Sequence, residues 1–162
     1  MDVDPIALTS RWLHVLGAIV LLGGAVFSRL VVLPAFDSLD ADERPRMHQL
    51  FGTKWGRWVG IATGLILLTG LYNYLAVTRL DHKGDGPYHA LMGVKMLLAL
   101  VTFFFAAALA GKSSALAKIR ERRKLWLTVT VLLGVAAVMI AGYLKMRGVV
   151  VVPTEPIASI SR

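Results

Sequence analysis

The chain has 162 residues, of which 56% are hydrophobic and 17% charged, with a net charge of +8 and no cysteine. This composition is far more apolar than that of a soluble domain, and the apolar residues lie in blocks long enough to cross a bilayer. The lack of cysteine excludes disulfides, thiolate metal sites and iron–sulfur clusters. The sequence has no hydrolase elbow, phosphate-binding loop, carboxylate pair or HExxH motif, which disfavours hydrolysis.

Four apolar segments predict transmembrane helices, at residues of about 8–36, 58–77, 88–110 and 125–144. Each is long enough for the ~20 helical residues that the hydrocarbon core of a bilayer requires. Backbone groups find no water there, and the alternation typical of a membrane barrel is absent, so helices are the expected form. We therefore predict an all-α integral membrane protein whose residues 1–148 form one four-helix bundle.

The first segment, residues 8–36, is expected to remain as a membrane helix and not to be removed as a signal peptide. Its leader carries Asp2 and Asp4 but no basic residue, and its apolar stretch is longer than a signal-peptide core. His14 lies in this segment at a depth of about 9 Å from its N-terminal end, which is the outer end in the orientation expected below. A neutral imidazole at this depth is a candidate ligand for copper or for haem iron.

The second segment begins with four glycines spaced by four residues, namely Gly52, Gly56, Gly60 and Gly64. Small residues at this spacing let another helix or a flat ligand approach the backbone closely. The first interpretation is tight helix packing, within the bundle or in a homo- or hetero-oligomer. The alternative is a porphyrin face against Gly60 or Gly64, with a matching smooth surface at Gly17, Gly23 and Gly24 of the first segment.

Lys95 lies about one third of the way into the third segment, which is otherwise uncharged. A charge at that depth costs about 3 kcal/mol on insertion scales, so an intramembrane lysine normally faces a partner, a cavity or a ligand. Its depth of about 10 Å from the outer surface matches that of His14. We therefore expect His14 and Lys95 to belong to one polar layer and to point into the bundle.

A second candidate ligand set lies on the same segment as Lys95. His89, Met92 and Met96 recur at intervals of three and four residues, so they share one face of a helix. Imidazole nitrogen and thioether sulfur suit Cu(I), whereas hard cations prefer carboxylates. The alternative is that the methionines are packing residues. His48 and His82 are expected to lie in loops among charged residues and to be solvated.

The basic residues give the expected orientation. Ten follow the first and third segments, namely Arg44, Arg46, Lys54, Arg57, Lys112, Lys118, Arg120, Arg122, Arg123 and Lys124. Six lie on the opposite side, namely Arg11, Arg79, Lys83, Lys145, Arg147 and Arg162. The positive-inside rule then places both termini outside the cytoplasm. The positive charge is interpreted as a signal for topology and for lipid headgroups, with no nucleic-acid partner.

The tail at residues 149–162 contains Pro153 and Pro156. It is too short and too interrupted by proline to form a further span. We expect this tail to lie on the outer surface.

Several motifs resemble those of the copper-resistance D (CopD-like) membrane domains. Arg11-Trp12-Leu13-His14, Gly23-Gly24 and Leu33-Pro34-Ala35 resemble the first helix of that family, Thr69-Gly70-Leu71-Tyr72-Asn73 resembles the end of its second helix, and Pro87-Tyr88 with Lys95 resembles its third. The resemblance implies a four-helix bundle in the bacterial inner membrane that handles copper, in transport or homeostasis. It also implies a metal donor as a partner and His14 and Lys95 as the matching polar positions.

The pairing of a histidine on helix one with a lysine on helix three is also similar to the bacterial four-helix protoporphyrinogen oxidases, which bind haem b. This resemblance implies an oxidoreductase with His14 as axial ligand, lysines that pair with the propionates, and a quinol or porphyrinogen as electron donor. Three hypotheses stay open. The chain handles copper through His14, with His89, Met92 and Met96 as further ligands; it is a haem b redox protein; or it is a small structural subunit.

Overall fold

The computed structural model describes residues 4–111 and 113–149, and all regular secondary structure within these two ranges is helical. The first long helix consists of α1 (Pro5–Phe27), a π-helical turn η1 (Ser28–Val32) and α2 (Leu33–Asp37). The second consists of α3 (Glu43–Tyr72), a π-helical turn η2 (Asn73–Thr78) and α4 (Arg79–Asp81). The third is α5 (Gly86–Ala110) and the fourth is α7 (Arg123–Arg147), joined by the short η3 (Ser114–Leu116) and α6 (Ala117–Glu121).

These four helices are each long and apolar enough to cross a membrane. The predicted all-α class is therefore confirmed, and the described residues contain the predicted four helices that are long and apolar enough to span a membrane. The helices are longer than the apolar segments, and the second begins at Glu43 instead of near residue 58. Its first turns are polar, and Glu43 lies where the helix dipole favours a negative charge. The helix thus extends beyond its apolar part.

Local capping signals fix where two of the helices begin. The Asp4 side chain accepts a hydrogen bond from the backbone N–H of Ile6 at 2.9 Å, and Pro5 occupies the first turn of α1. The Asp85 side chain accepts from the backbone N–H of Tyr88 at 3.1 Å, ahead of α5. An acidic cap followed by proline is a favourable helix start, since the first N–H groups have no partner within the helix.

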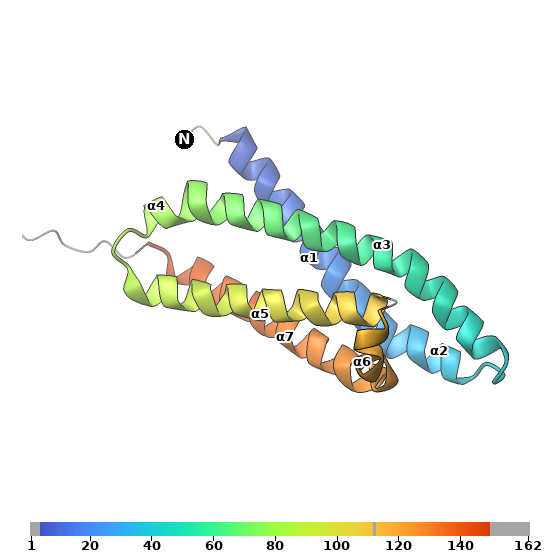
Figure 1. The fold of residues 1–162 in the computed structure, drawn as a ribbon. Helices are drawn as coiled ribbons and strands as arrows, with labels where there is room; N and C mark the ends of the chain where they lie inside the picture. The colour runs from blue at the N-terminus through green and yellow to red at the C-terminus, as the bar shows by residue number, and fades with distance from the viewer. Residues whose placement is uncertain (1–3, 112, 150–162) are drawn as a thin grey trace, which may run out of the picture.

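Helix α1 packs mainly against α3, and α5 packs mainly against α7, while α3 also contacts α5. The core between them is formed by one cluster of Leu21, Val59, Ala62, Ile66, Phe103 and Ala106 and a second of Ala25, Leu33, Leu109 and Leu127. Figure 1 shows the start of α1, α4 and the end of α7 at one end of the bundle, and α2 and α6 at the other. We refer to these as the α4 end and the α6 end. Most of the predicted tail, residues 150–162, lies outside the described residues.

The glycine series of α3 divides into two pairs. A Cβ at Gly56 would lie 3.3 Å from the Ala110 carbonyl oxygen of α5, and one at Gly52 would lie 3.9 Å from the same atom. A Cβ at Gly60 or Gly64 would meet no described atom within 4 Å. Gly52 and Gly56 therefore pack within the chain, and an oligomer contact through Gly60 and Gly64 stays a prediction.

Candidate functional site

The imidazole of His14 is anchored to α3 through one of its two ring nitrogens. His14 Nδ1 lies 3.1 Å from the Ile66 carbonyl oxygen and 3.1 Å from Thr69 Oγ1. A carbonyl oxygen only accepts hydrogen bonds, so Nδ1 carries the proton and donates it. The Thr69 hydroxyl donates its own proton to the Leu65 carbonyl at 2.6 Å, which leaves Thr69 Oγ1 free to accept. His14 Nε2 therefore keeps an unprotonated lone pair.

Gly70 lets the His14 ring lie this close to α3. A Cβ at Gly70 would lie 2.9 Å from His14 Cε1 and 3.3 Å from His14 Nδ1. Both separations are too short for a side chain without a shift of the ring. The Thr69-Gly70 pair thus supplies an acceptor and the space beside it, and together they fix the orientation of the imidazole. Metal-binding histidines usually have their second ring nitrogen fixed by a carbonyl or carboxylate in this way.

Lys95 is half-buried on α5, and the structure records no hydrogen bond or ion pair between it and a described residue. Its charge lies within electrostatic range of His14, and the charge of Arg11 lies within range of Lys95. No carboxylate in the described ranges acts on His14 or Lys95 in the same way. The structure therefore places the two predicted residues in one basic environment, while Arg11 is an addition that the sequence did not single out.

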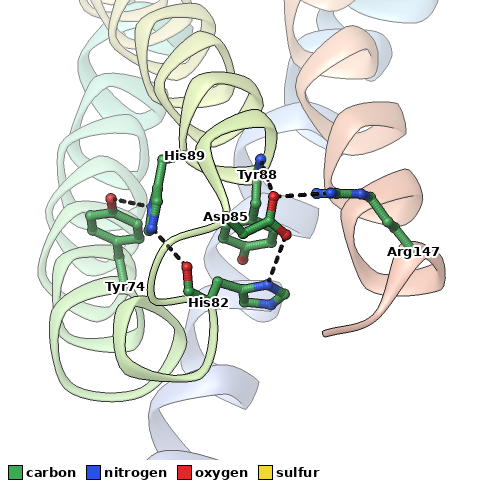
Figure 2. Close-up of polar contacts among 6 residues, drawn as sticks. All are labelled: Tyr74, His82, Asp85, Tyr88, His89 and Arg147. Atoms are coloured by element: carbon green, nitrogen blue, oxygen red, sulfur yellow. Dashed lines mark hydrogen bonds and ion pairs between the residues drawn. The ribbon is translucent and has the colours of Figure 1, made fainter. Parts of the chain in front are cut away.

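The other predicted ligand set is arranged differently. His89 Nε2 donates to the His82 carbonyl oxygen at 3.0 Å, so His89 Nδ1 accepts from the Tyr74 hydroxyl at 3.2 Å (Figure 2). Both ring nitrogens of His89 are thus already used, and metal binding would have to replace one of these bonds. Met92 and Met96 are half-buried. The described residues hold no group of three or more His, Cys, Asp or Glu that could bind a metal ion.

At the α4 end, an ion pair between a half-buried arginine and a buried aspartate joins the last turn of α7 to the start of α5. Arg147 Nη2 donates to Asp85 Oδ1 at 2.9 Å, and Asp85 Oδ2 lies 3.7 Å from His82 Nδ1. The His82 ring stacks on Tyr88 with centroids 3.5 Å apart (Figure 2). The hydrogen bond from Arg147 lowers the pKa of Asp85 below its ordinary value, with a further contribution from the backbone N–H of Tyr88.

The expectation that His82 is solvated is wrong, because its side chain is only 7% exposed. The loop folds inward since Asp85 caps α5 and draws both His82 and Arg147 toward itself. The expectation that His48 lies in a solvated loop is also wrong, because this residue belongs to α3 and is half-buried against Phe36. Sequence reasoning missed Asp85, Arg147 and Thr69 as contributors. The Asp85-Gly86-Pro87 sequence is a recognisable helix start, but nothing local indicates that Arg147 is its partner across the bundle.

Comparisons of this chain with protein-family models, with curated proteins and with solved structures found no match.

Proposed function

We propose that this is a membrane redox protein that holds haem b through Nε2 of His14. The observation that carries the proposal is the anchoring of His14, whose Nδ1 is fixed by the Ile66 carbonyl and Thr69 while its Nε2 has no hydrogen-bond partner among the described residues. Haem iron in proteins is commonly held by one neutral imidazole, whose tautomer and orientation are set by a hydrogen bond on the other nitrogen.

The charges around His14 support haem over a bare metal ion. Lys95 and Arg11 are basic, and no carboxylate of the described chain offsets them at this site. A metal cation bound at His14 would be repelled by a charged Lys95, whereas the propionates of haem b are anions that pair with lysine and arginine. The residues present therefore fit the group in both the neutral donor and the charges that they offer.

In this proposal His14 ligates the iron, Thr69 and Gly70 orient His14, and Lys95 and Arg11 pair with the propionates. Bound haem would supply one-electron redox chemistry, with a quinol or porphyrinogen as the source of electrons. The chain would position the haem and pair its propionates with basic side chains inside an apolar bundle.

Copper handling is the second candidate. The half-buried Met92 and Met96 lie on the same helix as Lys95 and would offer thioether sulfurs to Cu(I) beside His14. In this case Lys95 would have to be neutral to avoid repelling the ion. Replacement of Lys95 by an uncharged residue therefore distinguishes the two candidates. It is expected to lower the affinity for haem, and to raise the affinity for copper or leave it unchanged.

The test is absorption spectroscopy and metal analysis of the full chain purified from membranes. Haem b gives a Soret band, whereas copper handling gives bound copper without one. His14→Ala is expected to remove the bound group and leave the bundle folded, and Val15→Ala, an exposed neighbour, is the control. A wild-type protein with neither haem nor copper, or a His14→Ala variant with full occupancy, contradicts the proposal.

Two further variants test the supporting residues. Thr69→Val keeps the shape of the side chain but removes one of the two acceptors of His14 Nδ1 and leaves the Ile66 carbonyl, so affinity is expected to fall about 10-fold. Lys95→Met removes the charge at similar length, and Lys145→Met removes an exposed lysine of α7 as its control. Haem affinity is expected to fall in Lys95→Met alone.

A further inference from the structure

A small cavity lies near the α6 end of the bundle, where neither His14 nor Lys95 lines it. Its volume is about 40 Å³, and its walls are mainly apolar side chains of α1, α2, α3, α5 and α7. The polar residues in its lining are Ser28, His48, Arg123 and Thr130. A single water needs roughly 10–15 Å³, so the space is large enough for a small polar group.

Ser28 contributes an unused hydroxyl to the cavity wall. The side chain is 5% exposed, and its Oγ has no hydrogen-bond partner among the described residues. The buried hydroxyls of Thr69, Thr102 and Thr130 donate to carbonyls of their own helices at 2.6–2.7 Å, whereas Ser28, the first residue of the π-helical turn, does not. A buried hydroxyl without a partner costs free energy that an occupant of the cavity would recover.

Arg123 contributes a charge that no acid balances. Its Nη1 donates to His48 Nδ1 at 3.3 Å, and the structure pairs it with no carboxylate in residues 4–111 and 113–149. Asp37, an acid at the same end, is paired with Lys124 at 2.6 Å. The charge that acts on Arg123 is that of another cation, Arg120. The guanidinium therefore retains N–H groups that have no acceptor among the described residues.

The free groups of this cavity are a guanidinium, which carries a positive charge and only donates, and a hydroxyl, which can also donate, so a small anion matches them. We propose that the cavity binds one carboxylate group, held by the guanidinium of Arg123 and the hydroxyl of Ser28. A carboxylate has three heavy atoms and its two oxygens match the planar guanidinium in a two-pronged pair. A tetrahedral phosphate group is bulkier than a planar carboxylate and fits a cavity of about 40 Å³ less well. His48 positions Arg123 by accepting from Nη1.

The carboxylate group has two sources, a fatty acid in the bilayer and a small acid in solution. An open groove of about 510 Å³ shares Phe36, Phe51 and Trp55 with the cavity lining, and its other residues are Met47, Leu50, Lys54 and Trp58. This mainly apolar surface suits an acyl chain. We therefore expect a fatty acid to bind more tightly than acetate. The site is separate from the proposed haem site and does not depend on it.

The experiment uses the full chain in nanodiscs of zwitterionic phosphatidylcholine, titrated with oleate or acetate carrying ¹³C at the carboxyl carbon. Carboxyl NMR signals report binding, and ³¹P NMR follows inorganic phosphate as a third probe. We expect saturable binding of oleate, weaker binding of acetate and none of phosphate. Arg123→Gln is expected to weaken oleate binding about 10-fold or more, because a charge-assisted hydrogen-bond pair is lost. Ser28→Ala is expected to weaken it about 2- to 10-fold.

Arg122→Gln is the matched control, since it removes the same charge from an exposed neighbouring position and is expected to change the affinity less than about twofold. Thermal unfolding checks that each variant is folded. If Arg123→Gln does not fold, the oleate affinity of Ser28→Ala decides whether the proposed site exists. Acetate binding that depends on Arg123 supports the site with a small acid from solution as its ligand. Binding of oleate alone supports a fatty acid from the bilayer as the ligand. Equal losses in the Arg122 and Arg123 variants, an unaffected Ser28→Ala variant, or no saturable carboxyl signal would overturn the proposal.

Discussion

Gly24 of α1 lies directly against the indole ring of Trp55 in α3. A Cβ at Gly24 would overlap the Cη2 and Cζ2 atoms of that ring, whereas a Cβ at Gly23 would meet no described atom within 4 Å. The two adjacent glycines therefore have different roles, although the sequence presents them as a pair. Gly24 allows the close approach of α1 and α3, and Gly23 does not take part in it.

The first prediction is that Gly24→Ala destabilises the protein and Gly23→Ala does not. The added methyl group at Gly24 forces Trp55 to move within a packed interface, which typically costs about 1–3 kcal/mol. At Gly23 there is room, and alanine favours the helix by up to about 1 kcal/mol. Thermal unfolding in detergent measures both variants against the wild type. Equal midpoints for the two variants would show that Gly24 does not hold the α1–α3 contact.

The second prediction concerns the orientation of His14. Gly70→Ala places a methyl group within 2.9 Å of His14 Cε1, so the ring has to turn away from Ile66 and Thr69. We expect the affinity for the group bound at His14 to fall about 10- to 100-fold, as it does when a supporting contact of a ligating histidine is lost. The readout is occupancy of haem or metal after purification.

Gly142→Ala in α7 is the control for this experiment, because a Cβ there meets no described atom within 4 Å. Unchanged occupancy in Gly70→Ala, with a loss of thermal stability alone, would mean that the contact is structural. The two readouts therefore separate a role in ligand binding from a role in packing.

The four helices were predictable from the sequence because apolar length is a local property of each segment. Their ends were less predictable. The polar residues from Glu43 onward carry no apolar signal, yet they continue the helix of the second span through backbone hydrogen bonds. The π-helical turn Ser28–Val32 lies just before Pro34, which cannot donate a helical hydrogen bond, whereas the turn Asn73–Thr78 has no such local marker.

The candidate site was predictable in part. His14 and Lys95 are notable from sequence alone because a polar side chain inside an apolar span needs a reason. The partners of His14 depend on how α1 and α3 align along their lengths, and no local pattern fixes this alignment. The same holds for Arg147, whose acidic partner Asp85 is distant in the sequence. His82 was expected to be solvated because its loop is polar, but the pairing of Asp85 and Arg147 buries it.

The third prediction tests the orientation in the membrane. If all four apolar helices cross the membrane, both ends of the described chain lie on one side, and the basic residues concentrate on the other. A reporter fused after Arg162 is expected to be active outside the cytoplasm, and one inserted near Lys118 inside it. Opposite activities would reverse the orientation and place the His14 layer in the inner half of the bilayer.

The fourth prediction is that the Asp85–Arg147 pair stabilises the protein at neutral pH and loses this effect in acid. The pKa of Asp85 is lowered in the folded protein, chiefly by the hydrogen bond from Arg147. A lowered pKa means that the unfolded chain takes up the proton first as the pH falls. The contribution is therefore fully present above the unfolded pKa, which is about 3.9, and is lost as the pH falls through the lower folded value.

Asp85→Asn removes the charge and keeps an oxygen that can cap α5, so the variant isolates the ion pair from the cap. We expect Asp85→Asn to unfold at a lower temperature than the wild type at pH of about 7, with a difference that narrows below a pH of about 4. Asp81→Asn, at an exposed position in α4, is the control and is expected to shift the midpoint little at either pH. A difference between Asp85→Asn and the wild type that stays constant into acid would mean that the stabilisation does not come from the ionised carboxylate. In this case hydrogen bonds of the Asp85 side chain that do not need its charge, such as the one from the backbone N–H of Tyr88, would account for the stabilisation.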